Sequence, residues 1–464
     1  MRPPILLALG VPLLLVTLFP ALTPPSDPTH PVGHDREGLP TSTAPQPVWA
    51  ADPAHPLNRL HAALFVAERV PDEIGATLPA ERRRADVDDD AFFRGRWTFH
   101  MRKGDAITPS DAAIFGGDVR ISPVEDLRGE RGATVRTLLA DLSTRAHVEA
   151  IPALATPLAR VLLQWDLLFV LWRHEQNGNA DAATLDALAR AIDALALPRA
   201  TLAALPSGVD ALRAHVRGDP TDRTKPYMPE QLLAPSLDDG TTVDTTNGWR
   251  EIARDEKALF HATRSLRAAR IFVRAGDGAA TEAFVAASAA ATDAASTPTA
   301  PLGTEVALVL SLVAIDDAGQ AFATPVVDEL RIRRVTGPAE LHPDNGSSRD
   351  GWSQWIHMRS RARSVLGAEQ PFRFVRDTAQ SLFLEYGTAK HTTYFAQCAL
   401  CHRRTSTGGQ DPDGIKALGR YGKPSVERDA TARLRIAERQ FAPIVEKWRA
   451  RRDGASAAQG TTDR

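Results

Sequence analysis

The chain contains only two cysteines among its 464 residues, Cys398 and Cys401, and they stand three positions apart. Two cysteines this close cannot cross-link distant segments, so no disulfide framework can hold the fold together. Stability must therefore come from an apolar core, and a composition with 43% hydrophobic and 24% charged residues is sufficient for one. A chain of this length predicts two to four structural units.

The N-terminus carries the pattern of a targeting segment. Residues 1–22 contain Arg2 and then an apolar run, which predicts a secretory signal peptide or an N-terminal membrane anchor. We expect the body of the protein to be extracytoplasmic, in the periplasm or cell envelope, with this segment either cleaved or retained. The Pro-rich residues 23–56 predict an extended spacer. A net charge of −2 favours neither nucleic acid nor an anionic membrane surface as a partner, and we expect no nucleic-acid partner.

Hydrophobic periodicity predicts a mainly helical domain over residues 57–218. Its central stretch, LARVLLQWDLLFVLWRHEQ, is apolar, but the polar residues Arg160, Gln164 and Asp166 indicate a buried core helix rather than a membrane span. Within the same domain, the alternation in RGRWTFHMR predicts one strand near Trp97.

Residues 219–350 predict an α+β region. It contains a strand in ARIFVRAG, an Ala-rich helix, and two alternating runs around the turn sequence DDAG. Residues 351–452 predict a further helical region that includes both cysteines, and residues 453–464 a disordered tail. The expected fold class is mainly α with a smaller β portion (α+β).

Three chemistries use a C-x-x-C pair. A thioredoxin-type disulfide needs a β-α-β setting that the flanking sequence does not predict, and a zinc site needs a second close ligand pair that is missing. In covalent haem attachment, C-x-x-C-H, both thiols bond to the haem vinyl groups and the next residue, here His402, binds the iron. Chance gives this pattern on the order of once in 10,000 chains, so we adopt haem attachment. Predicted export agrees with it.

The stretch YFAQCALCH resembles the c-type cytochromes, with Tyr394 at their usual aromatic position. The resemblance implies one covalent haem c per chain, a C-terminal helical cytochrome c-like haem segment, and iron ligation by His402. Two features depart from the family pattern. Arg403 stands where small residues are common, and no methionine follows Met358, so the usual downstream methionine ligand is missing.

The sixth iron ligand has several candidates. His357 and Met358 lie in an aromatic-rich stretch, GWSQWIHMRS, and we expect His391 on a helix approaching the cysteines. Lys416 and Lys423 are further options, and an open sixth site is the other alternative.

Three functions fit these residues. The first is an extracytoplasmic single-haem c-type cytochrome that transfers electrons to a redox partner protein. The second is a haem enzyme with an open iron site that acts on peroxide or oxygen, with His357 or Arg359 assisting. The third is a haem-containing interaction or gas-sensing protein. The sequence contains none of the common hydrolase, metalloprotease or phosphate-loop motifs.

Overall fold

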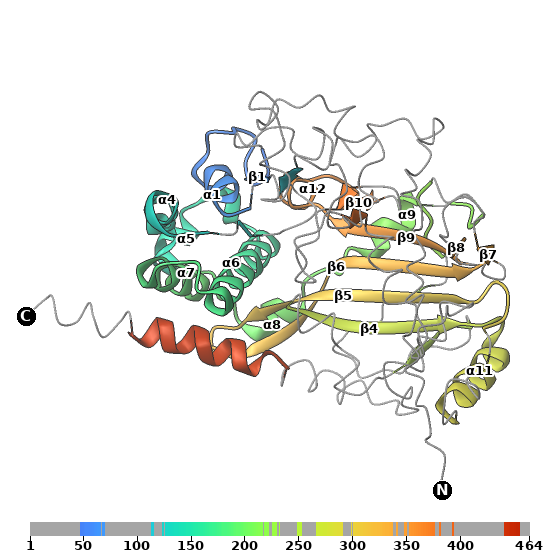
Figure 1. The fold of residues 1–464 in the computed structure, drawn as a ribbon. Coiled ribbons are helices and arrows are strands. Elements are labelled where there is room, and N and C mark those ends of the chain that lie inside the picture. The colour runs from blue at the N-terminus through green and yellow to red at the C-terminus, as the bar shows by residue number, and fades with distance from the viewer. Residues whose placement is uncertain are drawn as a thin grey trace, which may run out of the picture.

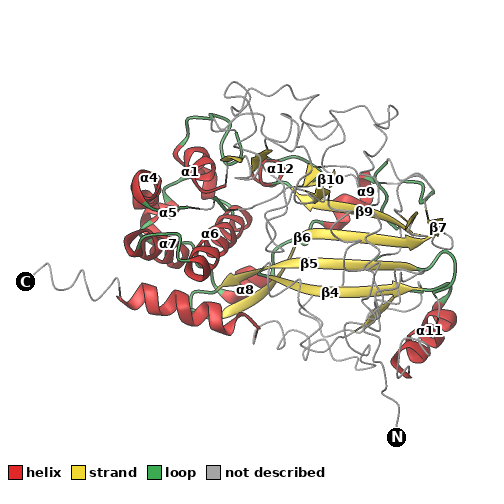
Figure 2. Cartoon of the chain, in the orientation of Figure 1, coloured by secondary structure: helices red, strands yellow, loops and turns green. Residues whose placement is uncertain are grey.

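The protein combines a group of helices with an antiparallel sheet, which confirms the predicted mixed α+β class (Figures 1 and 2). The computed structural model describes residues 47–65, 67–69, 113–115, 123–124, 126–216, 218–221, 225–229, 232, 248–252, 266–290, 298, 300–336, 340–341, 348–349, 352–375, 380–381, 392–393 and 440–454. The predicted targeting segment and the predicted strand near Trp97 lie outside these residues.

Most helices gather beside one end of the sheet, whereas α9 lies over one face of it and α11 lies at the opposite end (Figure 1). They are α1 (Pro56–Phe65), α4 (Gly129–Leu139), α5 (Arg145–Glu149), α6 (Pro157–Asn177), α7 (Ala182–Ala194), α8 (Arg199–Ala203), α9 (Val209–His215), α11 (Gly278–Ala290) and α12 (Arg361–Val365), with 3-10 turns η3 (Ala140–Leu142) and η4 (Pro152–Leu154).

Helix α6 is the centre of the helical part, and its ends follow from local sequence. The hydroxyl of Thr156 accepts a hydrogen bond from the backbone N–H of Ala159, and Pro157 occupies the first turn, where its missing donor costs nothing. Gly178, with φ of 67°, ends the helix. Most of α6 is buried, as predicted for a core helix. Among the described residues, no helix combines the length and apolar character that a membrane crossing requires.

Six strands form the main sheet in the order β10-β9-β6-β5-β4-β3, and each neighbouring pair is antiparallel. Their bounds are β3 (Arg250–Ile252), β4 (Arg267–Arg274), β5 (Glu305–Ile315), β6 (Ala321–Val335), β9 (Trp352–Arg359) and β10 (Phe372–Val375). Short pairs join β1 (Ala67–Arg69) to β2 (Ala113–Phe115), β7 (Glu340–Leu341) to β8 (Ser348–Arg349), and β11 (Gln380–Ser381) to β12 (Thr392–Thr393).

The hairpin between β5 and β6 forms at the predicted DDAG turn. The carboxylate of Asp316 accepts a hydrogen bond from the Gln320 N–H at 2.7 Å, and Gly319 takes the positive φ of 73° that the turn requires. The predicted strand in ARIFVRAG and the Ala-rich helix are also confirmed, as β4 and as α11 up to Ala290.

The C-terminal helix over residues 440–454 packs against α7 and the β5–β6 turn (Figure 1). Trp448 is fully buried, and its indole N–H donates to the Ala189 carbonyl at 3.1 Å. Arg451 pairs with Glu175 of α6. The apolar face of this helix is buried over its described part, where Phe441, Ile444 and Val445 are buried with Trp448.

The prediction of helix from residue 351 onwards is wrong over four described stretches, because β9 and β10 are strands of the main sheet and β11 and β12 form a short strand pair. The side chains of β9 are buried on both faces of the sheet from Ser353 to Arg359. Burial on both faces removes the clean polar–apolar alternation that signals a strand. The boundary expected at residue 350 therefore falls inside one continuous sheet.

The spacer predicted up to residue 56 ends earlier than expected. Trp49 is buried in the core, and the side-chain oxygen of Asn58 accepts hydrogen bonds from the backbone N–H groups of Val48 and Trp49 at 3.0 and 2.7 Å. The helix expected to carry His391 is also incorrect where it is described, because β12 follows that residue directly.

Candidate functional site

The residues predicted to attach and bind a haem, Cys398, Cys401 and His402, lie outside the described part of the chain, as does His391. Lys416 and Lys423 also lie outside it. What the structure describes is the two flanks of this segment. Strand β10 ends at Val375, the C-terminal helix is described from residue 440, and both belong to the same folded body.

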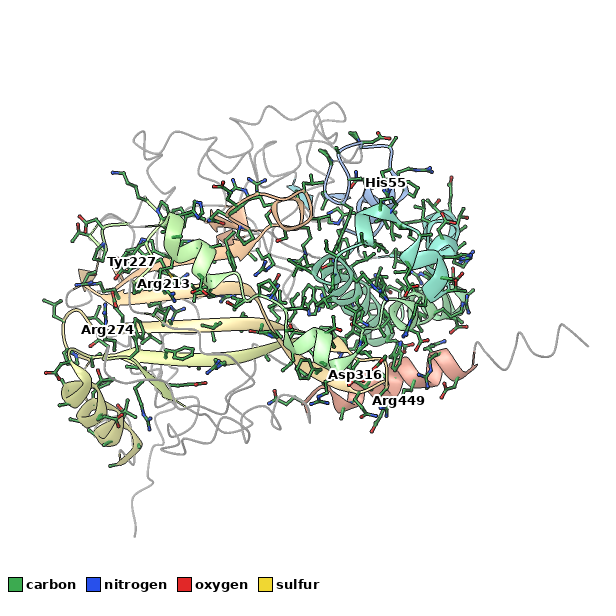
Figure 3. All side chains as sticks on the ribbon, turned by 180° about the vertical axis from the view of Figure 1, so that it is seen from behind. His55, Arg213, Tyr227, Arg274, Asp316 and Arg449 are labelled. Carbon is green, nitrogen blue, oxygen red and sulfur yellow. The ribbon has the colours of Figure 1, made fainter. Side chains whose placement is uncertain are left out.

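His357 lies on β9 opposite Leu330 of β6 and Phe374 of β10, on the face of the sheet that α9 covers. Figure 3, seen from behind, shows Arg213 of α9 and Tyr227 over this face. The Nε2 atom of His357 lies 2.8 Å from the Tyr227 carbonyl oxygen, and the ring packs on Phe374. Burial lowers the pKa of His357 to about 4, so the ring is neutral near pH 7 and donates to that carbonyl.

Met358 lies on the opposite face of the sheet, because successive side chains of a strand alternate. It stands opposite Glu329 of β6 and Arg373 of β10, and it is fully buried. The two candidate ligands therefore point away from each other, and a single haem plane could meet only one of them.

Arg359, the arginine considered for a distal role, is a buried structural residue. Its guanidinium donates to the carbonyls of Val327 at 2.6 Å and Ser207 at 2.5 Å, and it stacks on the Phe372 ring. Burial lowers its pKa to about 10, which still leaves it charged at neutral pH. Gly208 beside it has a φ of 80°, which favours glycine, and a Cβ there would also displace the Arg359 guanidinium, since it would lie 2.4 Å from Nη2.

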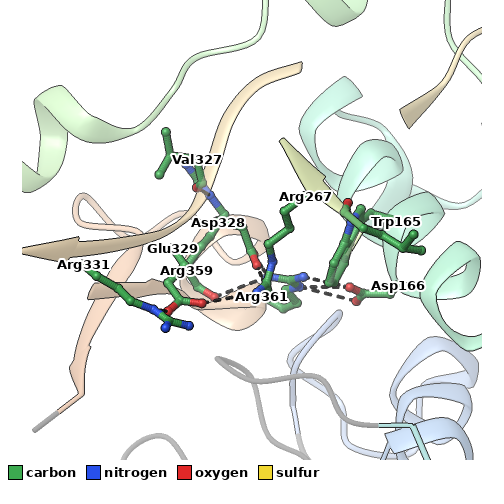
Figure 4. Close-up of polar contacts among 10 residues, drawn as sticks. Trp165, Asp166, Arg267, Val327, Asp328, Glu329, Arg331, Arg359 and Arg361 are labelled. Atoms are coloured by element: carbon green, nitrogen blue, oxygen red, sulfur yellow. Dashed lines mark hydrogen bonds and ion pairs between the residues drawn. The ribbon is translucent and has the colours of Figure 1, made fainter. Parts of the chain in front are cut away.

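The most unusual feature of the described residues is a buried group of charges between α6 and the sheet, which we name the junction cluster (Figure 4). Each member is at most 5% exposed. The members are Asp166, Arg267, Asp328, Glu329, Arg331, Arg359 and Arg361. Buried charges are costly unless they are paired, so their arrangement needs a physical account.

Acidic and basic side chains alternate along the junction cluster, from α6 into the sheet. Nη2 of Arg361 lies 2.8 Å from Oδ1 of Asp166, and Nη1 of the same guanidinium lies 2.5 Å from Oδ1 of Asp328. Arg267 of β4 then pairs with Asp328 at 2.6 Å and with Glu329 at 3.2 Å. Arg331 closes the series on Glu329.

A β-bulge makes this series possible. Leu310 of β5 pairs with Glu329, whereas the next residue, Ser311, pairs with Val327, so Asp328 is the extra residue of the bulge. Without the bulge, Asp328 and Glu329 would point to opposite faces of the sheet. With it, both carboxylates lie within reach of the single guanidinium of Arg267.

Trp165 supports the two central arginines from the α6 side. The guanidinium carbons of Arg267 and Arg361 lie 5.0 and 5.3 Å from its ring centroid, which is cation–π distance. The indole N–H donates to the Leu266 carbonyl at 2.9 Å. Leu266 has a φ of 53°, which is a strained value for a branched residue, and it immediately precedes Arg267.

Burial and charge shift the carboxylates of the cluster in opposite directions. Burial raises the pKa of Asp166 to about 7, because Arg361 compensates it only in part. Burial also disfavours ionised Asp328, but Arg361 and Arg267 outweigh this effect and lower its pKa. The pKa of Arg361 is raised, since its two carboxylate partners outweigh the cost of burial.

Of the junction cluster, the sequence singled out only Asp166, as a sign that α6 is not a membrane span, and Arg359, for a role at the haem; the other members were not predicted. One available signal was an acidic residue beside a tryptophan in the middle of an apolar helix. The arrangement can hold elements together and can exchange a proton, but it exposes no open position for a substrate.

No grouping of three or more His, Cys, Asp or Glu side chains suited to a metal ion occurs among the residues that the structure describes. No protein-family model matches the chain, and neither a curated protein nor a solved structure matches it.

Proposed function

We propose that the chain is an extracytoplasmic protein with one covalently bound haem c, which transfers electrons between this haem and a redox partner protein. The observation that carries the proposal is the lone pair Cys398 and Cys401 followed directly by His402. The thiols fix the haem to the chain, and the imidazole of His402 binds the iron on one side. Residues 1–22 would direct the protein out of the cytoplasm, where haem attachment takes place.

The described flanks on either side of the haem-attachment segment are both tied to the folded body. On one side, β10 pairs with β9 in the main sheet, and Arg361 ties the connection between these strands to α6. On the other side, Trp448 and Arg451 tie the C-terminal helix to α7 and α6.

The sixth iron ligand decides between a carrier and an enzyme. His357 would have to give up its hydrogen bond to the Tyr227 carbonyl and leave a buried core before it could bind iron. Met358 is the last methionine of the chain, and it stands opposite Arg373, two residues before β10 ends. Met358 is fully buried as well and would also have to leave the core, so the remaining alternatives are ligation by His391, which suits a carrier, and an open site, which suits an enzyme.

A haem enzyme that acts on peroxide or oxygen is the second candidate function. It is favoured by the absence of any methionine after Met358 and by the engagement of His357 in the core. An iron without a sixth protein ligand can bind a small molecule directly. A gas-sensing or interaction role would use the same open position.

Absorption spectra of the full-length haem protein, oxidised and reduced, with and without carbon monoxide, test the two functions against each other. In a carrier, four porphyrin nitrogens and two protein side chains would bind the iron. Such an iron should remain low-spin and bind carbon monoxide slowly. Rapid binding to the reduced protein would contradict the carrier and support the enzyme or sensor.

Methionine ligation has its own signature, a weak sulfur–iron band at the red end of the oxidised spectrum. We expect this band to be absent. If it is present, Met358→Leu should abolish it, whereas Met228→Leu, a matched change at another buried methionine, should leave it intact.

A further inference from the structure

The contact between Asp166 of α6 and Arg361 of α12 is the least compensated ion pair of the junction cluster. Asp166 is fully buried, and among the described residues its carboxylate accepts hydrogen bonds from Arg361 alone. That guanidinium is shared with Asp328. Asp328 and Glu329, by contrast, are each contacted by two arginines.

Other charges near Asp166 come from three elements. Arg361 projects from α12, Arg267 from β4 and Asp328 from β6. Arginine does not lose its proton in proteins, so Asp166 and Asp328 are the groups here that can change charge. Asp328 lies between two arginines, which favours its ionised form. Asp166, at the end of the series, is the group that can take up a proton at lowest cost.

We propose that the contact between Asp166 and Arg361 is a proton-operated latch, which holds α12 against α6 while Asp166 is protonated and weakens when Asp166 ionises. A protonated carboxyl group has little hydration to lose on burial and still accepts from Arg361 through its carbonyl oxygen. The ionised carboxylate of Asp166 shares Arg361 with Asp328, and it is therefore more stable in water than in this buried site. The latch does not depend on the proposed haem.

The direction of the pH effect follows from proton linkage. Burial raises the pKa of Asp166 to about 7 from its ordinary value of 3.8 in water, so the closed latch binds the proton more tightly than an open, hydrated form. Raising the pH through this window therefore favours opening. Between pH 5 and pH 8 the opening equilibrium should rise on the order of a hundredfold. Asp328, with its lowered pKa, titrates below this window.

Amide hydrogen exchange over α12 in the full-length protein measures this opening. The N–H of Ser364 donates to Ser360 at 3.0 Å, and that of Leu366 donates to Ala362 at 2.8 Å. After correction for the intrinsic exchange rate, protection of these amides should fall by one to two orders of magnitude from pH 5 to pH 8. Protection that stays constant over this range would overturn the latch.

Two variants separate Asp166 from other titrating groups. Asp166→Asn keeps the neutral form at every pH, so the pH dependence of protection over α12 should disappear. Asp181→Asn, a change at the half-exposed N-cap of α7, should keep the wild-type dependence. An unchanged pH dependence in Asp166→Asn would contradict the proposal.

If Asp166→Asn does not fold, the wild-type protein still decides the question. The carboxyl carbon of Asp166 can be followed by nuclear magnetic resonance in selectively labelled protein. A titration midpoint near pH 7 supports the latch, and a midpoint at or below the ordinary value for aspartate refutes it.

Discussion

Arg361 and Asp166 are 195 positions apart in the chain, yet Nη2 of Arg361 lies 2.8 Å from Oδ1 of Asp166. The same guanidinium reaches Asp328 of β6. One side chain thus joins α6, the sheet and the connection between β9 and β10. The helices and the sheet are held together by apolar packing and also by this fully buried series of charges (Figure 4).

Removal of Arg361 should destabilise the protein strongly. Arg361→Met leaves Asp166 buried without its partner, and the loss of one member of a buried pair costs about 3–5 kcal/mol. Chemical denaturation measures this loss. Arg128→Met is the matched control, because Arg128 pairs with Asp126 at an exposed site, where solvent screens the charges and the loss should be far smaller. Equal shifts in the two variants would refute a special role for the junction cluster.

His357 should make the fold sensitive to acid. Its pKa is lowered from 6.5 to about 4 by burial, so the unfolded state takes up a proton first as the pH falls. The stability from neutral His357 is complete above pH 6.5 and is lost as the pH falls towards 4, by up to about 3 kcal/mol.

A comparison of variants isolates this contribution, because His174 acts in the same direction and Asp166 in the opposite one. His357→Gln, whose amide can still donate to the Tyr227 carbonyl, should show a shallower loss of stability between pH 6.5 and pH 4 than the wild type. His215→Gln, at an exposed site, should keep the steep loss. If His357→Gln loses stability as steeply as the wild type over this pH range, His357 is not the cause of the acid sensitivity.

Trp448 should be the main anchor of the C-terminal helix. Trp448→Ala removes a fully buried ring and its hydrogen bond to Ala189, and we expect a loss of about 3–5 kcal/mol in the free energy of unfolding. Leu302→Ala, at an exposed position, should change stability by less than about 0.5 kcal/mol. A small effect of Trp448→Ala would mean that the helix contributes little to the fold.

The elements that local sequence determines were predictable. Helix α6 could be read from Thr156, Pro157 and Gly178 at its ends, and the β5–β6 hairpin from its DDAG turn. Strand β9 could not be predicted in this way. Its stability depends on pairing with β6 and on burial of both faces, and neither is encoded within residues 352–359.

Of the candidate functional residues, one group could be predicted from the sequence and the other could not. The haem-attachment motif is a local pattern, so the sequence predicts it without a structure. The junction cluster unites residues separated by long stretches of chain, and it depends on a bulge at Asp328 that no local signal announces. Which arginine meets which carboxylate could be known only from the fold.

Export is predicted from residues 1–22. A fusion of this segment to a reporter that is active only outside the cytoplasm should give signal, because Arg2 and the apolar run after it have the pattern of a targeting segment. A control fusion with two charged residues placed inside the apolar run should be inactive. Retention of the full-length protein in the cytoplasm would contradict both the predicted localisation and the route to haem attachment.

Covalent haem is the central claim, and a denaturing gel stained for haem tests it most directly. The full-length protein, produced in cells that have a haem-attachment system, should keep its haem after denaturation, because two thioether bonds from Cys398 and Cys401 survive unfolding. The double variant Cys398→Ala and Cys401→Ala should lose the stain. Haem retained by that variant, or a wild-type protein that never stains, would contradict the account.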